Sequence, residues 1–301
     1  MATDRRKALP EGDPRSVRGA ARDSAEPMSL RPSLQPAPPV PPLSRRFVDA
    51  LSSLIVHLGQ IGIMTWQAMK AIFQRPLEIK STIYQMESLG VSSVGIASVT
   101  AIFVGMVMAV QFAFGLQKFG GMEYTGRIIG LSFSRELAPT LTAIIVGGRI
   151  GAGIAAEMGS MAVTEQIDAI RALGADPVKK LVVPRLVAGV IVMPVLGAFA
   201  LVLGFAGAMF ICSVEFDIPP GFFLRTALGS VNFRDYLSGM FKCPFFGAII
   251  SLVGCHFGLI TRGGTEGVGQ STTRTVVVIS ISILIADFFL TKVSILLFPS
   301  R

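Results

Sequence analysis

The residues of this sequence most able to do chemistry are charged side chains inside long apolar segments. This group comprises Arg135, Glu136, Arg149, Glu157 and Asp287. A charge is costly in hydrocarbon and normally faces a partner or a wet cavity. Two interpretations are open: the charges contact the polar head group of a lipid, or they form structural pairs that lock helices together. Lys292 is one possible partner for Asp287.

Covalent chemistry and metal binding are not expected. His57 and His256 are far apart in the sequence, and Cys212, Cys243 and Cys255 lack CxxC spacing. HExxH and GxSxG motifs are absent, which disfavours an intramembrane enzyme, and without a GxxxxGK[ST] motif the chain is not expected to bind ATP itself. The stretch Gly151–Ala156 formally matches a dinucleotide fingerprint, but it lies in a long apolar segment without a preceding strand.

Composition indicates which elements must position these charges. Hydrophobic residues make up 51% of the 301 residues, charged residues 15%, and the mean hydropathy is +0.63, which is too apolar for a water-soluble domain. The net charge of +8 does not indicate nucleic-acid binding, because Lys and Arg also accumulate in cytoplasmic loops of membrane proteins. The sequence therefore predicts an all-α integral membrane protein.

Five membrane spans are predicted from apolar runs long enough to cross the hydrocarbon core. They cover about 88–117, 126–158, 186–214, 243–261 and 273–298. Residues 44–75 show helical periodicity with basic ends and Trp66, which favours an amphipathic helix in the membrane interface; a first true span is the alternative. Residues 1–43 are rich in proline and predict a disordered tail. Translation from Met28 instead of Met1 stays open.

The distribution of basic residues predicts the orientation of the spans. Lys70, Arg75 and Lys80 precede the first span, and the loop of about 159–185 holds further Lys and Arg residues. Because basic residues favour the cytoplasmic side, we expect the tail and this loop to face the cytoplasm.

Small residues recur every fourth position along the second span. They are Ala143, Gly147, Gly151, Ala155 and Gly159. Such a ladder lets another helix approach closely. It predicts a tight helix contact, either with a second copy of the chain or within one bundle.

Large, soft apolar side chains form an approximate stripe along the first span. They are Val104, Met108, Phe112, Leu116 and Phe119. Met and Phe suit an adaptable apolar pocket. Ordinary packing or lipid-facing side chains are the alternative.

A short helix is predicted in the loop at residues 164–174. Thr164 is a candidate N-cap, and Gly174 followed by Asp-Pro ends the helix. Ile167, Ile170 and Leu173 share roughly one face. A helix of this kind is shaped to fit a groove of a cytosolic partner; a plain surface connector is the alternative.

Five motifs in order carry a family resemblance. They read SRELAP at 134–139, GRIGA at 148–152, AEMGSM at 156–161, TEQIDA at 164–169 and STTRTV at 271–276. The chain resembles the MlaE/TGD family of ABC transporter permeases over about residues 44–298. The resemblance implies a homodimer in the bacterial inner membrane that works with a dimer of cytosolic ABC ATPases, which bind ATP and Mg, and with an MCE-domain lipid-binding protein. It implies phospholipid movement between an inner and an outer membrane; an ion-coupled secondary transporter of a hydrophobic solute is the alternative.

The resemblance also implies roles for particular residues. The coupling helix that engages the ATPase corresponds to Glu165, Gln166, Ile167, Asp168, Ile170, Arg171 and Leu173. The first, second and fifth spans line the lipid cavity, so the lipid-binding residues expected are the stripe on the first span together with Arg135, Glu136 and Arg274. No cofactor is expected on this chain.

Overall fold

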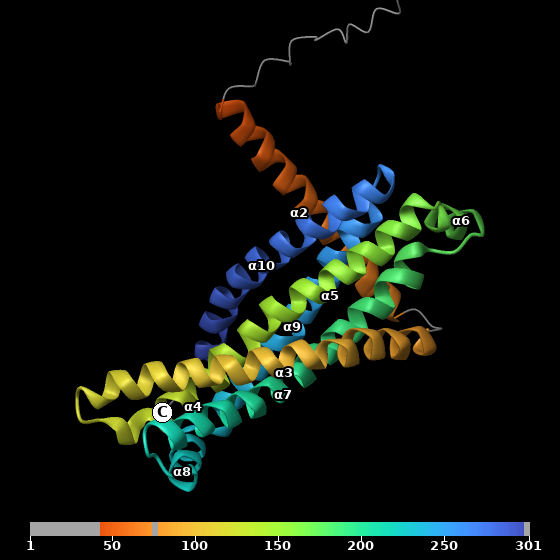
Figure 1. Ribbon diagram of the computed structural model, residues 1–301. Helices are drawn as coiled ribbons and strands as arrows, with labels where there is room; N and C mark the ends of the chain where they lie inside the picture. Colours follow the sequence, from red (N-terminus) through yellow and green to blue (C-terminus); the bar gives the residue numbers. More distant parts are fainter. Residues whose placement is uncertain (1–42, 74–77, 298–301) are drawn as a thin grey trace, which may run out of the picture. The chain divides into compact units, whose positions relative to one another are not determined.

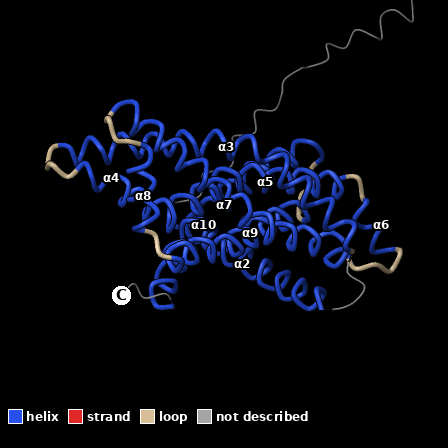
Figure 2. The backbone as a smooth tube through the Cα atoms, turned by 90° about the horizontal axis from the view of Figure 1, so that it is seen from below, coloured by secondary structure: helices blue, strands red, loops and turns tan. Residues whose placement is uncertain are grey.

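The computed structural model describes residues 43–73 and 78–297. Figure 1 shows these residues as helices, and Figure 2 shows them joined by short loops, without a strand in the described part. The predicted tail lies outside the described residues, apart from its last residue. The all-helical fold expected from the composition is thus confirmed.

Five helical segments are long and apolar enough to cross a membrane. They are α3 (Ile79–Gln117), the segment Met122–Val163, the segment Val178–Glu215, α9 (Phe233–Leu259) and α10 (Gly264–Leu297). The second combines η1 (Met122–Tyr124), α4 (Thr125–Ser132), η2 (Phe133–Leu137) and α5 (Ala138–Val163). The third combines η3 (Val178–Val182) and α7 (Val183–Glu215). The predicted number of spans, five, is therefore confirmed.

The helices extend beyond the predicted spans at several ends. The first begins at Ile79 rather than at 88, and the fourth begins at Phe233 rather than at 243. A capping box at Asn232 and Asp235 fixes the latter start. Polar residues near the ends stay helical because backbone groups in the membrane must be hydrogen-bonded within the chain. As a consequence Lys242, which the predicted spans leave in a loop, lies inside α9.

The helix α2 (Leu43–Phe73) precedes the five segments and is not one of those apolar enough to span. The chain divides into two compact units between Ser52 and Ser53, and the unit from Ser53 onward contains the five segments. In this unit Met64, Ala68 and Ala71 of α2 are buried in the main core. A position of α2 in the membrane interface stays a prediction.

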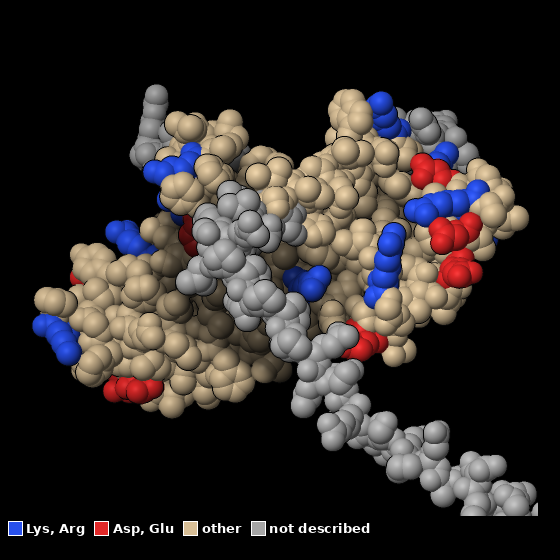
Figure 3. Space-filling view, turned by 90° about the horizontal axis from the view of Figure 1, so that it is seen from above, with Lys and Arg blue, Asp and Glu red and all other residues tan. Residues whose placement is uncertain are grey.

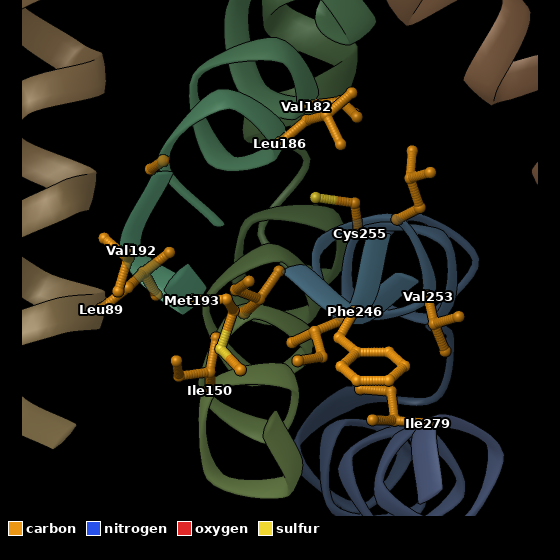
Figure 4. Close-up of a cluster of buried hydrophobic side chains, with 14 of the residues drawn as sticks. Leu89, Ile150, Val182, Leu186, Val192, Met193, Phe246, Val253, Cys255 and Ile279 are labelled. Carbon is orange, nitrogen blue, oxygen red and sulfur yellow. The ribbon is translucent and has the colours of Figure 1, made fainter. Parts of the chain in front are cut away.

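The main core lies where α5, α7, α9 and α10 meet. Figure 4 shows side chains of these helices converging, among them Ile150, Met193, Phe246 and Ile279. The close approach of α3 to α7 depends on glycine: a Cβ atom at Gly105 would lie 2.0 Å from the carbonyl oxygen of Gly204.

The two ends of the helical unit differ. The α6 end carries α6 (Gln166–Ala172), and the opposite end, here called the α8 end, carries α4 and α8 (Pro220–Ser230) (Figure 1). Between the ends, α3 and α10 leave much of their surface exposed: 28% and 11% of their most apolar windows are buried. Large apolar side chains such as Ile281, Leu284 and Phe288 are exposed on α10. These faces must contact lipid or another chain.

Candidate functional site

A cluster of ion pairs connects three spans towards the α8 end. Its first member is Arg135, whose Nε donates a 2.8 Å hydrogen bond to Oδ1 of Asp235. Asp235 is buried, and its Oδ2 also accepts the backbone N–H of Asn232 at 2.9 Å. The same carboxylate thus caps α9 and neutralises Arg135 of the second apolar segment.

The second member of the cluster is Lys242, whose side chain is 1% exposed. Its Nζ forms an ion pair with Glu136 and lies 3.1 Å from Oδ1 of Asp287 and 2.7 Å from Oγ1 of Thr291. The hydroxyl of Thr140 donates to the same Asp287 oxygen at 3.0 Å. One buried ammonium therefore joins η2, α9 and α10, and its desolvation is offset by two carboxylates.

The pairing of Asp287 differs from the sequence expectation. Lys292 does not pair with it; its Nζ lies 6.0 Å from the ring centre of Phe288. Lys242 pairs with Asp287 because α9 begins ten residues earlier than predicted and carries the lysine into the bundle. Asp235, Lys242 and Thr291 were not identified from the sequence, although a lysine directly before an apolar run was a usable signal.

Arg135 and Glu136 lie in a π-helical turn, η2, within an otherwise α-helical segment. Such turns often occur at functional sites. Their side chains keep contact with the exterior, with 35% of Arg135 and 41% of Glu136 exposed, whereas their partners Asp235 and Lys242 are buried. Arg135 and Glu136 are therefore a polar patch on the surface of the bundle, and their ion pairs with buried Asp235 and Lys242 hold them in place.

The stripe on α3 lies beside its buried face. Val104 packs against a cluster around Phe133, and Phe112 packs against a cluster around Ile129. Met108 and Leu116 are half-buried, and Phe119 is 87% exposed. The structure therefore brings Val104 next to the η2 turn, while Phe119 stands at the end of the helix.

Arg274 is not brought to this cluster. It is exposed on α10, about 20 Å along the axis from Asp287 at 1.5 Å per residue. It lies nearer the α6 end than the α8 end.

The small-residue ladder of α5 packs within the chain. A Cβ at Gly147 would lie 2.5 Å from Cδ1 of Ile250 in α9, and one at Gly151 would lie 2.0 Å from Cδ1 of Ile279 in α10. Ala143 and Ala155 are fully buried, and a Cβ at Gly159 would lie 3.1 Å from Oγ1 of Thr261. Of the two interpretations, the geometry supports contact within one bundle.

The loop helix α6 begins differently from the sequence expectation. Glu165 is its N-cap and has a left-handed φ of 58°. Thr164 instead ends α5, because its hydroxyl donates to the carbonyl of Ser160 at 2.8 Å. The expectation that Thr164 caps the loop helix is wrong.

The apolar face of α6 is directed into the chain's own core. Ile167 is 4% exposed, and Ile170 packs against the same core cluster. Leu173, in contrast, is 86% exposed. The surface of α6 open to a partner therefore combines polar residues with two alanines and one leucine: Glu165, Gln166, Asp168, Ala169, Arg171, Ala172 and Leu173.

A hollow adjoins this open surface. A cavity of about 370 Å³ is lined by Glu165, Asp168 and Arg171 on one side and by the turn 261–264 on the other. Arg171 and Asp168 form an ion pair at 2.8 Å. Figure 3 shows charged side chains of both signs gathered at the right of the view, at the α6 end, while most of the remaining visible surface is uncharged.

The two histidines are not solitary. Nδ1 of His57 in α2 lies 3.0 Å from Nε2 of His256 in α9, and both rings contact Phe257. Among residues 43–73 and 78–297, no group of three or more His, Cys, Asp or Glu side chains is arranged to hold a metal ion. The pair joins α2 to the bundle.

Comparison with known proteins gives the family. The family model described as Permease MlaE matches residues 82–293. A probable ABC transporter permease protein of Synechocystis sp. is 41% identical over 80% of this chain and 92% of its own length. The chloroplastic protein TRIGALACTOSYLDIACYLGLYCEROL 1 of Arabidopsis thaliana is 37% identical over 77% of this chain and 66% of its own length. A probable ABC transporter permease protein of Rickettsia conorii is 35% identical over 78% and 91%.

The matched region begins within α3 and ends within α10, so it contains most of these two segments and all of the other three, together with the ion-pair cluster and α6. The chain is therefore a multi-pass membrane protein that belongs to the MlaE family of ABC transporter permeases, the non-catalytic membrane subunits that work with an ATPase.

Proposed function

We propose that this chain moves phospholipid between an inner and an outer membrane, as a homodimer that works with a dimer of cytosolic ABC ATPases and an MCE-domain lipid-binding protein. The observation that carries the proposal is the partly exposed ion-pair cluster on a largely apolar surface. An amphiphile needs both: a polar spot for its head group and apolar helix faces for its acyl chains. The name of the Arabidopsis relative contains that of a glycerolipid, which supports a lipid cargo.

The exposed helix faces support the homodimer. Most of α10 is unburied, and its exposed side chains near Asp287 include Leu284 and Phe288. A second copy facing the first across α3, α5 and α10 would enclose a space between two apolar walls, each with one charged cluster. Phospholipid in that space would contact Met108 and Leu116 of α3 and the exposed parts of Arg135 and Glu136.

The open surface of α6 supports the route of coupling. Ile167 fixes α6 to the core that α5, α7 and α9 share, so a force applied to the exposed side of α6 would be passed to the spans rather than absorbed by a loose loop. In this proposal ATP binding and hydrolysis in the partner move α6. We also propose that the chain lies in a bacterial inner membrane with its N-terminus in the cytoplasm.

Reconstitution tests this function. The permease co-purified with its ATPase is placed in vesicles with a fluorescent phospholipid, and transfer to acceptor vesicles carrying the MCE-domain protein is followed with ATP, without ATP, and with a proton gradient alone. We expect transfer only with ATP. Transfer driven by the proton gradient in the absence of the ATPase would instead indicate the ion-coupled transporter.

A further inference from the structure

A second charged site lies on α5, away from the ion-pair cluster. Arg149 makes its hydrogen bonds within the described residues through Nη1 alone, to Oγ of Ser92 at 3.1 Å and to Oγ of Ser93 at 2.9 Å. Both acceptors are neutral, and among the described residues Arg149 has no carboxylate partner. Nε and Nη2 are left without a partner there.

The serines are oriented to hold the guanidinium group. The hydroxyl of Ser93 donates to the carbonyl of Leu89 at 2.7 Å, and that of Ser92 donates to the carbonyl of Ser88. Because each hydroxyl proton is bonded backward along α3, the oxygen lone pairs face Arg149. One edge of the guanidinium is fixed, and the rest of the fork remains available for a bidentate acceptor.

The depth of Arg149 makes an unpaired charge costly. At 1.5 Å per residue it lies about 10 Å along the axis from the middle of the segment Met122–Val163, which is long and apolar enough to cross a membrane. Its side chain is exposed rather than enclosed by the chain. An arginine at such a depth must face an anion or water.

The surface around Arg149 is hollowed, and both polar and apolar residues line the hollow. A cavity of about 360 Å³ is lined by Arg149, Ser88, Ser92 and Glu157 together with Leu89, Ile150, Gly153 and Ile154. Glu157 does not neutralise Arg149: it accepts a 2.6 Å ion pair from the buried Arg185 and lies about 12 Å along the helix axis. The cavity thus offers an open guanidinium fork beside Gly153, whose position is exposed.

We propose that Arg149, Ser92 and Ser93 form a binding site for the phosphate group of a phospholipid, closer to the α6 end than the ion-pair cluster is. The anionic phosphate fits the open guanidinium fork of Arg149. The inference rests on the proposed lipid cargo and adds a second place where that cargo binds. It makes Arg149 a lipid-binding residue separate from Arg135.

Photo-crosslinking tests the site. Gly153 lines the cavity, and a Cβ atom there meets nothing within 4 Å, so a photoreactive residue is tolerated. Gly95 of α3 is a matched control, because its Cβ also meets nothing within 4 Å and it does not line the cavity. The permease–ATPase complex is reconstituted in vesicles of phosphatidylethanolamine and phosphatidylglycerol that contain phosphate-labelled phosphatidylglycerol.

We expect labelling at Gly153 to fall about tenfold in Arg149→Gln, the loss of one charge-assisted bidentate contact, while labelling at Gly95 is unchanged. Arg149→Lys should keep only part of the signal, because lysine lacks the fork. Excess inorganic phosphate should not compete. Equal labelling at both positions, no dependence on Arg149, or competition by inorganic phosphate would overturn the site.

Crosslinking of Gly153 to a second copy of the chain in place of lipid would also overturn it. Transfer of fluorescent phospholipid by the wild-type complex is measured in parallel. If ATP-driven transfer is present and the Gly153 signal is independent of Arg149, the second site fails while the proposed function stands.

Discussion

The Nζ atom of Lys242 in α9 lies 3.1 Å from Oδ1 of Asp287 in α10, although only 1% of the lysine side chain is exposed. Removing one member of a buried pair leaves the other charges uncompensated, which costs about 3–5 kcal/mol. We therefore expect Lys242→Met to lower the stability of the detergent-solubilised chain by several kcal/mol, measured by thermal or denaturant unfolding.

Lys292→Met is the matched control for this change. Lys292 lies over the ring of Phe288 and makes no ion pair with a described residue, so its loss should change stability by less than about 1 kcal/mol. Combining Lys242→Met with Asp287→Asn and Glu136→Gln should recover part of the loss. Similar unfolding of the two lysine variants would show that the cluster is not a structural anchor.

The contact between α3 and α7 predicts opposite effects for two glycines of α3. Gly105→Ala places a Cβ 2.0 Å from a backbone oxygen that cannot move aside, so we expect a loss of about 1–3 kcal/mol. Gly95→Ala meets nothing within 4 Å and should gain up to about 1 kcal/mol from helix propensity. Unfolding of both variants in the same detergent checks the prediction. Equal stability of the two would argue against close packing at Gly105.

The α6 helix predicts a separation between docking and folding. Leu173→Asp changes a side chain that is 86% exposed, so we expect it to abolish co-purification of the ATPase while stability stays near that of the wild type. Ile167→Asp buries a charge in the core, and we expect it to lower the free energy of unfolding. Pull-down and unfolding are measured on both variants. Retention of the ATPase by Leu173→Asp would exclude the exposed end of α6 as its docking site.

The sequence was sufficient to predict five spans and the loop helix, because apolar length and the stop at Gly174 are local signals, although the N-cap expected at Thr164 was wrong. It did not predict which charges meet. The partners Asp235 and Lys242 depend on where α9 begins and on the π turn that aims Arg135 and Glu136, and both are set by tertiary packing. The contact of His57 with His256 likewise joins residues about 200 positions apart, which no local pattern reports.

One further contact could have been predicted and was not. Ala97, Ala101, Gly105, Ala109 and Ala113 repeat every fourth position in α3 and are its buried face. This ladder is as regular as that of α5. The sequence analysis instead singled out the larger residues beside it, as a stripe that could contact lipid. Two residues of that stripe, Val104 and Phe112, pack against buried clusters. They do so because the helices that cover the small residues of α3 also contact the larger residues next to them.

Photo-crosslinking along α3 tests whether the remaining stripe meets bound lipid. A photoreactive residue at Met108, Phe112 or Leu116 should capture phosphate-labelled phospholipid, and one at Val195 of α7 should capture much less. Exposure alone predicts the reverse order, since Val195 is 64% exposed whereas Met108 and Leu116 are half-buried. Stronger labelling at 108 and 116 than at 195 therefore cannot come from bulk bilayer and requires lipid held against α3. Position 112 is the weakest probe, because Phe112 packs against the cluster around Ile129 and we expect its replacement to disturb that packing. Equal labelling at all positions, or the strongest at 195, would remove the α3 stripe from the lipid path.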